Sequence, residues 1–178
     1  MRELRRHVTG PDRVSAEAGV VEPLLGAIGG RTTSGNIALA FALDGELSTE
    51  QAAVRLRALG FTTAYPAVTG GMMEFRRWDG AAPLASGPFG TVEPRPDPHG
   101  PIPTSELHAV IVPLVAFDSH CHRIGFGRGF YDRAFANPDR PLLVGVAFDI
   151  QELPEWEPED WDVPLDVVIT PTRTLRRR

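Results

Sequence analysis

The residues with the clearest chemistry are three alternating glycines, Gly125, Gly127 and Gly129, in the segment GFGRGFYDR. This segment follows an apolar run of strand type and precedes a short predicted helix. Glycines in such a place let backbone N–H groups approach a polyphosphate, and the first helical turn adds the positive end of its dipole. The same spacing also occurs in purely structural turns, so the glycines alone leave both interpretations open.

The neighbours of these glycines favour nucleotide binding. Arg123 and Arg128 can pair with phosphate oxygens, and Phe130, Tyr131 and Asp132 supply a ring, a hydroxyl and a carboxylate suited to Mg²⁺. The segment has neither the GK[ST] of a P-loop nor the G-x-G-x-x-G spacing of a dinucleotide-binding turn. The sequence therefore predicts a triphosphate site of another type. The alternative is that Asp132 only forms a surface ion pair with a neighbouring arginine.

Four stretches together resemble the 5-formyltetrahydrofolate cyclo-ligase family. They are FALDGELST (41–49), the strand around Tyr65 and Pro66, VPLVAFD (112–118) followed by Arg123 and the glycine-rich segment, and EDWDVPLDVVITP (159–171). The likeness runs in order from about residue 37 to the end of the chain. Independently of this likeness, five strand candidates with interleaved helices predict an α/β fold: a single-domain, open, mostly parallel sheet with helices on both faces, in a Rossmann-like three-layer arrangement.

The resemblance implies an enzyme that uses ATP and Mg²⁺ to convert 5-formyltetrahydrofolate to 5,10-methenyltetrahydrofolate, releasing ADP and phosphate. In that family ATP phosphorylates the formyl oxygen, the neighbouring ring-side nitrogen closes on the activated carbon, and phosphate leaves. Such chemistry depends on positioning and on neutralising charge, so it needs no nucleophilic Ser, Cys or His.

The resemblance also assigns site residues, position by position. ATP contacts are implied for the consecutive residues Arg123, Ile124, Gly125, Phe126, Gly127, Arg128, Gly129, Phe130 and Tyr131. Folate contacts are implied for Phe41, Glu46, Met73, Phe75, Gly127, Gly129 and Tyr131, with Glu46 at the pterin edge. Arg123, Arg128 and Tyr131 become the catalytic groups, and Asp132 and Asp162 the Mg²⁺ ligands. From the residues alone, Glu46 could equally be a helix-entry carboxylate and Asp162 part of a solvated acidic run.

Two departures from the family stand out. Family members carry a lysine and then an arginine, which grip the ATP phosphates, in a helix upstream of the first loop. Here that pair would fall before Met1, which leaves Arg2, Arg5 and Arg6 as candidate replacements. The family also usually has a glycine in the turn where this chain has Cys121.

The missing basic pair keeps a second function class open, a non-catalytic paralogue that binds folate or nucleotide with weak or lost activity. A third candidate is an isomerase or transferase acting on phosphorylated sugars, which rests on fold analogy alone.

The first half of the chain contains the elements that would hold the folate side of this site. We expect an N-terminal region (1–36) with a helix around 12–26 and a loop, then an apolar strand at 37–43. Ser48 and Gln51 form a capping-box pattern for a helix near Thr49 that ends at Gly60. A strand at 62–68, broken by Pro66, completes a parallel strand–helix–strand unit.

The second half supplies the nucleotide side. A strand is predicted at 72–78, followed by a proline-rich loop (80–104) of a length typical of a lid or binding loop. Apolar strands are predicted at 108–117, 142–148 and 166–170, and the basic tail 175–178 is expected to fray.

Composition limits the classes of partner. The chain has 178 residues, 42% of them hydrophobic, which fits one domain spanning 1–178. A formal net charge of -5 argues against nucleic acid as a partner, and no run reaches membrane-spanning length. With one cysteine and a polar start, we expect a cytoplasmic monomer or weak homodimer whose partners are small-molecule folate and ATP.

Overall fold

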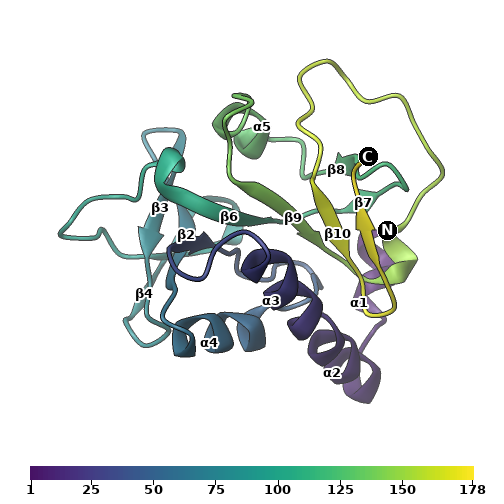
Figure 1. Cartoon of the computed structure of the whole chain (residues 1–178), viewed down its shortest axis with the longest axis horizontal. Coiled ribbons are helices and arrows are strands. Elements are labelled where there is room, and N and C mark those ends of the chain that lie inside the picture. Colours follow the sequence, from purple (N-terminus) through teal and green to yellow (C-terminus); the bar gives the residue numbers. More distant parts are fainter.

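The fold is built on a seven-stranded sheet, seen in a computed structural model that describes residues 1–178 (Figure 1). Across the sheet the strands are β11 (Thr174–Arg176), β10 (Val167–Ile169), β9 (Leu142–Val146), β6 (Leu107–Val112), β1 (Asn36–Ala38), β2 (Thr62–Thr69) and β3 (Met72–Arg77). All neighbours from β10 to β2 pair in parallel, and the two edge strands are antiparallel. The predicted fold class is confirmed.

The chain changes direction across the sheet at β1. It first builds outward through β2 to β3, and then returns to place β6 on the other side of β1 before continuing to β9 and β10. The connections that leave the carboxyl ends of β1 and β6 therefore diverge. In open parallel sheets such a switch point leaves a crevice at the carboxyl ends of the strands, where ligands bind.

Each face of the sheet is covered by its own apolar cluster. Helices α2 (Gly10–Gly19), α3 (Val21–Gly29) and α4 (Glu50–Ala58) lie along one face, and α5 (Phe130–Ala134) lies over the other (Figure 1). The second face is also covered by a hairpin of β7 (Ala116–Phe117) and β8 (Arg123–Ile124). The short 3₁₀ turns are η1 (Pro88–Gly90), η2 (Thr104–Glu106) and η3 (Asp149–Gln151). None of the helices has the length and apolar character needed to cross a membrane.

The N-terminal region differs from the single helix predicted at 12–26. It contains a short helix α1 (Arg2–Arg6), then α2 and α3, which meet at Val20. Pro11 lies in the first turn of α2, as expected. Pro23 lies in the first turn of α3, where its missing N–H would have had no partner within the helix, so it begins a helix instead of ending one.

Strand β1 is shorter than the apolar run that predicted it. Its pairing with both neighbours ends at Ala38, and the chain then leaves the sheet towards a turn at Asp44 and Gly45. Both turn residues have positive φ, 56° and 78° respectively. The early end of β1 also explains why Pro66 does not break β2, because Ala64 is the last β2 residue paired with β1 and a missing N–H on that side costs nothing.

Helix α4 ends as predicted but begins differently. Gly60 has φ 87° just past its end, and the Phe61 N–H donates to the Leu56 carbonyl, which closes the last turn. The N-cap is Thr49 and makes no side-chain capping bond, so the predicted Ser48–Gln51 capping box is not formed. Leu59, directly after the last helical residue, is 58% exposed.

Two segments are more regular than predicted. The proline-rich loop contains an antiparallel hairpin of β4 (Leu84–Ser86) and β5 (Val92–Pro94). The basic tail does not fray at its start, because Thr174–Arg176 form the edge strand β11 against β10. In both cases the segment is ordered by backbone pairing with a neighbouring strand. The amino-acid composition of the segment does not predict this pairing.

Phe75 on β3 offers a test of the second apolar cluster. It is fully buried, its ring lies 5.9 Å from that of Phe135, and its carbonyl accepts a hydrogen bond from Ile102. We expect Phe75→Ala to lower the free energy of unfolding in urea by about 3–5 kcal/mol. Met72→Ala on the same strand, at a side chain that is 75% exposed, should change it by less than about 0.5 kcal/mol. Equal effects of the two substitutions would contradict this placement.

Candidate functional site

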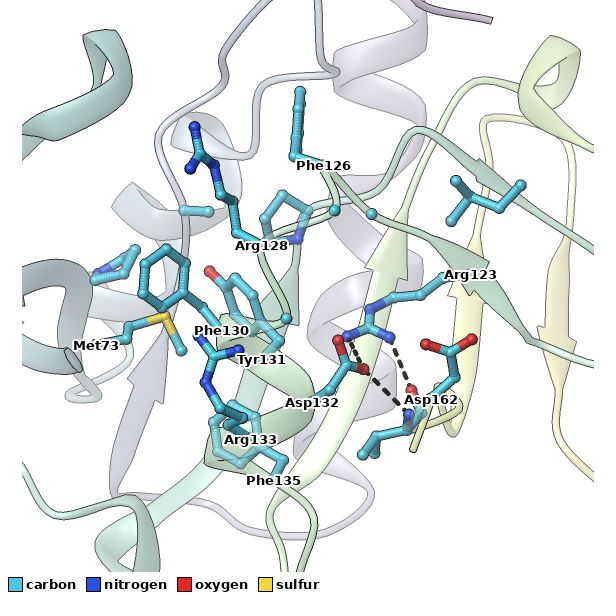
Figure 2. A pocket seen from close by; sticks show the side chains of 18 of the residues that line it. Met73, Arg123, Phe126, Arg128, Phe130, Tyr131, Asp132, Arg133, Phe135 and Asp162 are labelled. Atoms are coloured by element: carbon cyan, nitrogen blue, oxygen red, sulfur yellow. Dashed lines mark hydrogen bonds and ion pairs between the residues drawn. The ribbon is translucent and has the colours of Figure 1, made fainter. Parts of the chain in front are cut away.

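A cleft of about 1670 Å³ opens where the chain leaves β1 and β6. The glycine-rich segment forms one wall of it, and the residues from Ala40 to Glu46 form another. Part of the proline-rich hairpin and the segment around Asp162 complete the rim (Figure 2). The switch point of the sheet thus brings together segments that are far apart in the sequence.

The glycine-rich segment leaves its backbone N–H groups free. None of the amides from Gly125 to Gly129 donates to a protein acceptor. A Cβ at Gly125 or Gly127 would meet nothing within 4 Å, and Gly127 and Gly129 have φ of 77° and 62°. The loop is therefore not packed against protein and presents donors to the cleft, as an anion-binding turn does. Helix α5 has only five residues, so the expected dipole contribution is small and the loop amides dominate.

Two arginines of this segment carry no carboxylate partner. The Arg128 guanidinium lies 4.0 Å from the centre of the Phe89 ring, and that of Arg133 lies 5.3 Å from the centre of the Phe130 ring. Figure 2 shows the Arg128 side chain reaching away from the ion-paired residues. Both are among the residues that line the cleft, so their positive charge is available to an anion.

Arg123 has a different place from the one the sequence suggested. Its side chain is 5% exposed, and it donates to Asp132 Oδ1 at 2.7 Å and to the Val163 carbonyl at 2.9 Å. The Val163 N–H donates to the same Asp132 oxygen at 3.1 Å. Arg123 therefore does not present a free guanidinium to a phosphate. It joins β8 to α5 and to the segment that carries Asp162 (Figure 2).

Of the two predicted metal ligands, Asp132 belongs to this network and Asp162 lies beside it. Asp132 Oδ2 receives no hydrogen bond from the protein, and Asp162 directly precedes Val163, whose backbone contacts both Asp132 and Arg123. The chain contains no group of three or more His, Cys, Asp or Glu side chains that could hold a metal ion. Mg²⁺ typically takes one or two carboxylates and completes its shell with water and phosphate oxygens, so this donor set fits Mg²⁺ held together with a nucleotide.

Glu46 is a buried carboxylate that borders the cleft. Its Oε2 accepts a hydrogen bond from the Leu43 N–H at 3.0 Å, while its Oε1 is buried without any hydrogen-bond partner. Burial raises the pKa of Glu46 from 4.5 to about 7, against the opposing effects of the Leu43 N–H and the Arg5 guanidinium. A buried acceptor without a partner costs free energy until a donor reaches it.

The apolar side of the cleft includes Phe41 and Met73, and Phe41 belongs to a cluster of three aromatic rings. Phe41 lines the cleft and stacks on Tyr65 at 4.3 Å, and Trp78 packs edge-on against both rings at 5.2 Å. Met73 also lines the cleft, but Phe75 does not. The implied folate contact at Phe75 is therefore not supported, because Phe135 and Ile102 cover this side chain in the core.

Tyr131 lies between the two halves of the site. It lines the cleft and its ring is 6.3 Å from that of Phe135. Burial, followed by the nearby Glu46 charge, raises the pKa of the Tyr131 hydroxyl above its ordinary value. The hydroxyl is thus a stable hydrogen-bond donor at neutral pH.

The three N-terminal arginines separate into different roles. Arg2 lines the cleft and pairs with Asp44, with its guanidinium 5.3 Å from the centre of the Phe126 ring. Arg6 also pairs with Asp44 and does not reach the cleft. Arg5 is fully buried beneath the turn, so it cannot replace a phosphate-binding residue.

Sequence analysis missed residues of the proline-rich loop. Phe89, Thr91 and Glu93 line the cleft, and Phe89 supports Arg128 from a left-handed conformation with φ 63°. The only signal was the length of this loop. Trp161 also lines the cleft and is 69% exposed, so it does not anchor the C-terminal segment in the core.

The turn between β7 and β8 explains one departure from the family. Cys121 has φ 67°, a conformation that glycine adopts without strain. Its N–H donates to the Asp118 carbonyl, and the Asp118 carboxylate accepts hydrogen bonds from the N–H groups of His120 and His122. The turn keeps its left-handed shape despite the side chain, which is fully buried in the second apolar cluster.

Comparison with known proteins places the chain in a family. The model of the 5-formyltetrahydrofolate cyclo-ligase family matches residues 1–171. The chain belongs to this family. It is 33% identical to the 5-formyltetrahydrofolate cyclo-ligase of Haemophilus influenzae over 175 residues, which cover 95% of this chain and 93% of that protein. It is also 33% identical to the Escherichia coli cyclo-ligase over 142 residues, 77% of this chain and 78% of that one.

A solved structure of the family shares the fold. The NMR structure of Aquifex aeolicus 5,10-methenyltetrahydrofolate synthetase superimposes with a TM-score of 0.84 at 26% identity, covering 99% of this chain and 89% of that one. The family match begins at residue 1, so it includes the N-terminal helices, for which the sequence alone indicated no likeness.

The buried carboxylate of this cyclo-ligase family member predicts a pH-dependent stability. Because the folded-state pKa of Glu46 is raised from 4.5 to about 7, the folded protein favours the protonated carboxyl group. The free energy of unfolding therefore falls as the pH rises through that range. Glu46→Gln cannot ionise. Between about pH 5 and pH 8 it should gain on the order of 2–3 kcal/mol in unfolding free energy relative to wild type.

Urea unfolding at several pH values measures this difference. Glu157→Gln, at an exposed carboxylate, serves as the control and should follow wild type at every pH. If the free energies of unfolding of Glu46→Gln and wild type change with pH in parallel, ionisation of Glu46 does not destabilise the fold.

Proposed function

We propose that the protein is an ATP- and Mg²⁺-dependent 5-formyltetrahydrofolate cyclo-ligase that forms 5,10-methenyltetrahydrofolate, ADP and phosphate. The observation that carries this proposal is a single cleft with unpaired backbone donors on one wall and an unpaired carboxylate oxygen on another. The donors suit a polyphosphate and the acceptor suits the N–H groups of a pterin edge. Membership of the family supports assigning the two ligands to the cyclo-ligase reaction.

The glycine-rich segment would hold the nucleotide. The free amides from Gly125 to Gly129 face the cleft, and Arg128 adds a guanidinium that forms no ion pair within the protein. The Phe89 ring fixes that guanidinium by stacking, so less side-chain freedom is lost when a phosphate binds. In this proposal Arg128 neutralises phosphate charge and Arg123 acts through Asp132.

The turn at Glu46 would hold the folate. An ionised Glu46 can accept hydrogen bonds from a pterin edge, and such charge-assisted bonds gain strength when solvent is excluded. Phe41 and Met73 supply apolar contact area beside it. Gly127 and Gly129 contribute backbone at the junction of the two ligands, and the protonated Tyr131 can donate to an oxygen that gains negative charge during the reaction.

Asp132 and Asp162 would hold Mg²⁺. When bound there, the ion neutralises phosphate charge during phosphoryl transfer. Arg123 keeps the Asp132 carboxylate aimed at the cleft through the 2.7 Å contact to its Oδ1, which leaves Oδ2 for a ligand. The Val163 N–H reinforces the same orientation from the opposite segment.

One observation supports the weaker alternative, a folate-binding paralogue with low activity. Arg2 and Arg6 are both engaged by Asp44, so neither takes the place of a free phosphate-gripping pair. In that case the cleft would bind folate through Glu46 but turn over slowly or not at all.

We also propose that the protein acts in the cytoplasm as a monomer or weak homodimer. Support comes from its single buried thiol, Cys121, which needs no oxidising compartment, and from its moderate negative charge of -5. Sedimentation of the purified protein over a range of concentrations tests the oligomeric part.

The decisive experiment mixes purified protein with Mg²⁺, ATP and 5-formyltetrahydrofolate and follows the absorbance of the methenyl product, with 5-formyltetrahydrofolate binding measured in parallel. We expect product and ADP in equal amounts, both dependent on Mg²⁺. Folate binding without turnover would instead identify the paralogue. No binding of either ligand would refute the proposal altogether.

Asp132→Asn separates metal chemistry from folate binding. Asparagine keeps an oxygen for the Arg123 and Val163 contacts but loses the charge that attracts Mg²⁺. We expect kcat to fall by on the order of 100-fold, while the Kd for 5-formyltetrahydrofolate stays within about twofold of wild type. Asp139→Asn, an exposed change outside the cleft, is the matched control. Unchanged kcat in Asp132→Asn would remove this residue from the metal site.

A further inference from the structure

Arg5 is a fully buried arginine beneath the candidate folate site. It lies on α1 and has no exposed surface, although arginine is almost never buried without partners. Placing a guanidinium out of water costs several kcal/mol by itself, in the order of magnitude typical of buried ions. A side chain kept there at such a cost has a specific set of partners.

Those partners are backbone carbonyls of two segments that border the cleft. Arg5 Nε donates to the Asp44 carbonyl at 2.9 Å, and Nη2 donates to the Leu43 carbonyl at 3.3 Å. Nη1 donates to the Leu114 carbonyl at 2.9 Å, just beyond the end of β6. One side chain therefore ties the turn after β1 to the chain after β6, across the switch point of the sheet.

The same guanidinium faces the Glu46 carboxylate. Arg5 Nη2 lies 3.7 Å from Glu46 Oε1, the oxygen that is buried without a hydrogen bond, and 3.9 Å from Asp44 Oδ2. The separation is too long for a hydrogen bond, but a charge at this distance in a buried site acts strongly. The other charged or titratable groups that face Glu46 are Asp44 on its own turn, Arg2 on α1 and Tyr131 on α5.

We propose that Arg5 is a positioning residue for the folate site: its charge favours the ionised form of Glu46, and its three carbonyl contacts fix the Leu43–Glu46 turn. The inference rests on the proposed function, in which Glu46 receives the pterin. It gives α1 a role other than phosphate binding. The free Oε1 is left for the ligand because Arg5 supplies charge to it without occupying it.

Arg13 provides a control built into the fold. It also contacts this turn through backbone, donating to the Gly45 carbonyl at 3.4 Å and to the Glu46 carbonyl. Its charge is paired with Glu17 at 2.9 Å, outside the cleft. Arg13→Met therefore loosens the turn without removing a charge from the carboxylate, whereas Arg5→Met does both.

The test follows the Glu46 carboxyl carbon by ¹³C NMR during a pH titration, with the resonance assigned through Glu46→Gln. We expect Arg5→Met to raise the Glu46 pKa by about one unit or more, a tenfold change in proton affinity. Arg13→Met should leave this pKa within about 0.3 units of wild type, well below that effect. Equal shifts in the two variants, or no shift in Arg5→Met, would overturn the inference.

Binding of 5-formyltetrahydrofolate by calorimetry gives a second readout. At pH 7 a one-unit rise in the Glu46 pKa from about 7 lowers its ionised fraction from one half to about one eleventh, so Arg5→Met should bind about fivefold more weakly than wild type. The loss should shrink as pH rises above the shifted pKa. Arg5→Lys, which keeps the charge, should retain most of the wild-type pH profile. A loss in Arg5→Met that is constant with pH would mean that only the turn geometry matters.

These readouts stand apart from turnover. If wild type binds folate but forms no methenyl product, the proposed activity fails while the Arg5 inference is still decided by titration and binding. If Arg5→Met does not fold, the double variant Arg5→Met/Glu46→Gln decides, because removing both charges relieves the unpaired carboxylate. A double variant that remains as unstable as the single one would overturn the role of charge.

Discussion

The structure of the site depends on keeping a carboxylate buried at the wall of a cleft. The Glu46 carboxylate accepts only one hydrogen bond, from the Leu43 N–H, and this is insufficient for an ionised group out of water. The nearby Arg5 cation offsets part of the cost, which requires α1 to close against the end of β6. The N-terminal helix is thus part of the binding architecture, although it contributes no apolar layer to the sheet.

The glycine-rich segment also leaves polar groups unpaired beside the cleft, but these groups are donors, whereas Glu46 offers an acceptor. Its amides have no protein acceptors, and Arg128 has no carboxylate, so donors and positive charge face the cleft unpaired. Unpaired groups destabilise a fold, and here the two apolar clusters on either side of the sheet supply the compensating stability. A ligand that brings acceptors to this wall and donors to Glu46 satisfies both sets at once.

The sequence predicted the elements whose patterns are local. Helix α4 ends at Ala58, two residues before the predicted stop at Gly60, and strands β2, β6 and β9 overlap their predicted runs. The failures occur where a neighbour decides the outcome. Strand β1 stops when the chain leaves its partners, and the terminal residues become β11 because β10 offers an edge. Neither neighbour is visible in a local pattern.

The residues of the site show the same difference between what a local pattern predicts and what packing decides. Motif positions located Glu46, the glycines and Asp132, because those residue types and their order are specific. What each side chain contacts was not predictable: Arg123 is occupied by Asp132 and Val163, and Phe75 is covered by Phe135 although Met73, two positions away, reaches the cleft. Arg5 was one of three candidate replacements for the phosphate-binding pair, because its charge is visible in the sequence and its burial is not. Only the packing of α1 beneath the turn shows that this cation acts on a carboxylate of its own protein, which is why charge alone is a poor guide to which arginine meets the ligand.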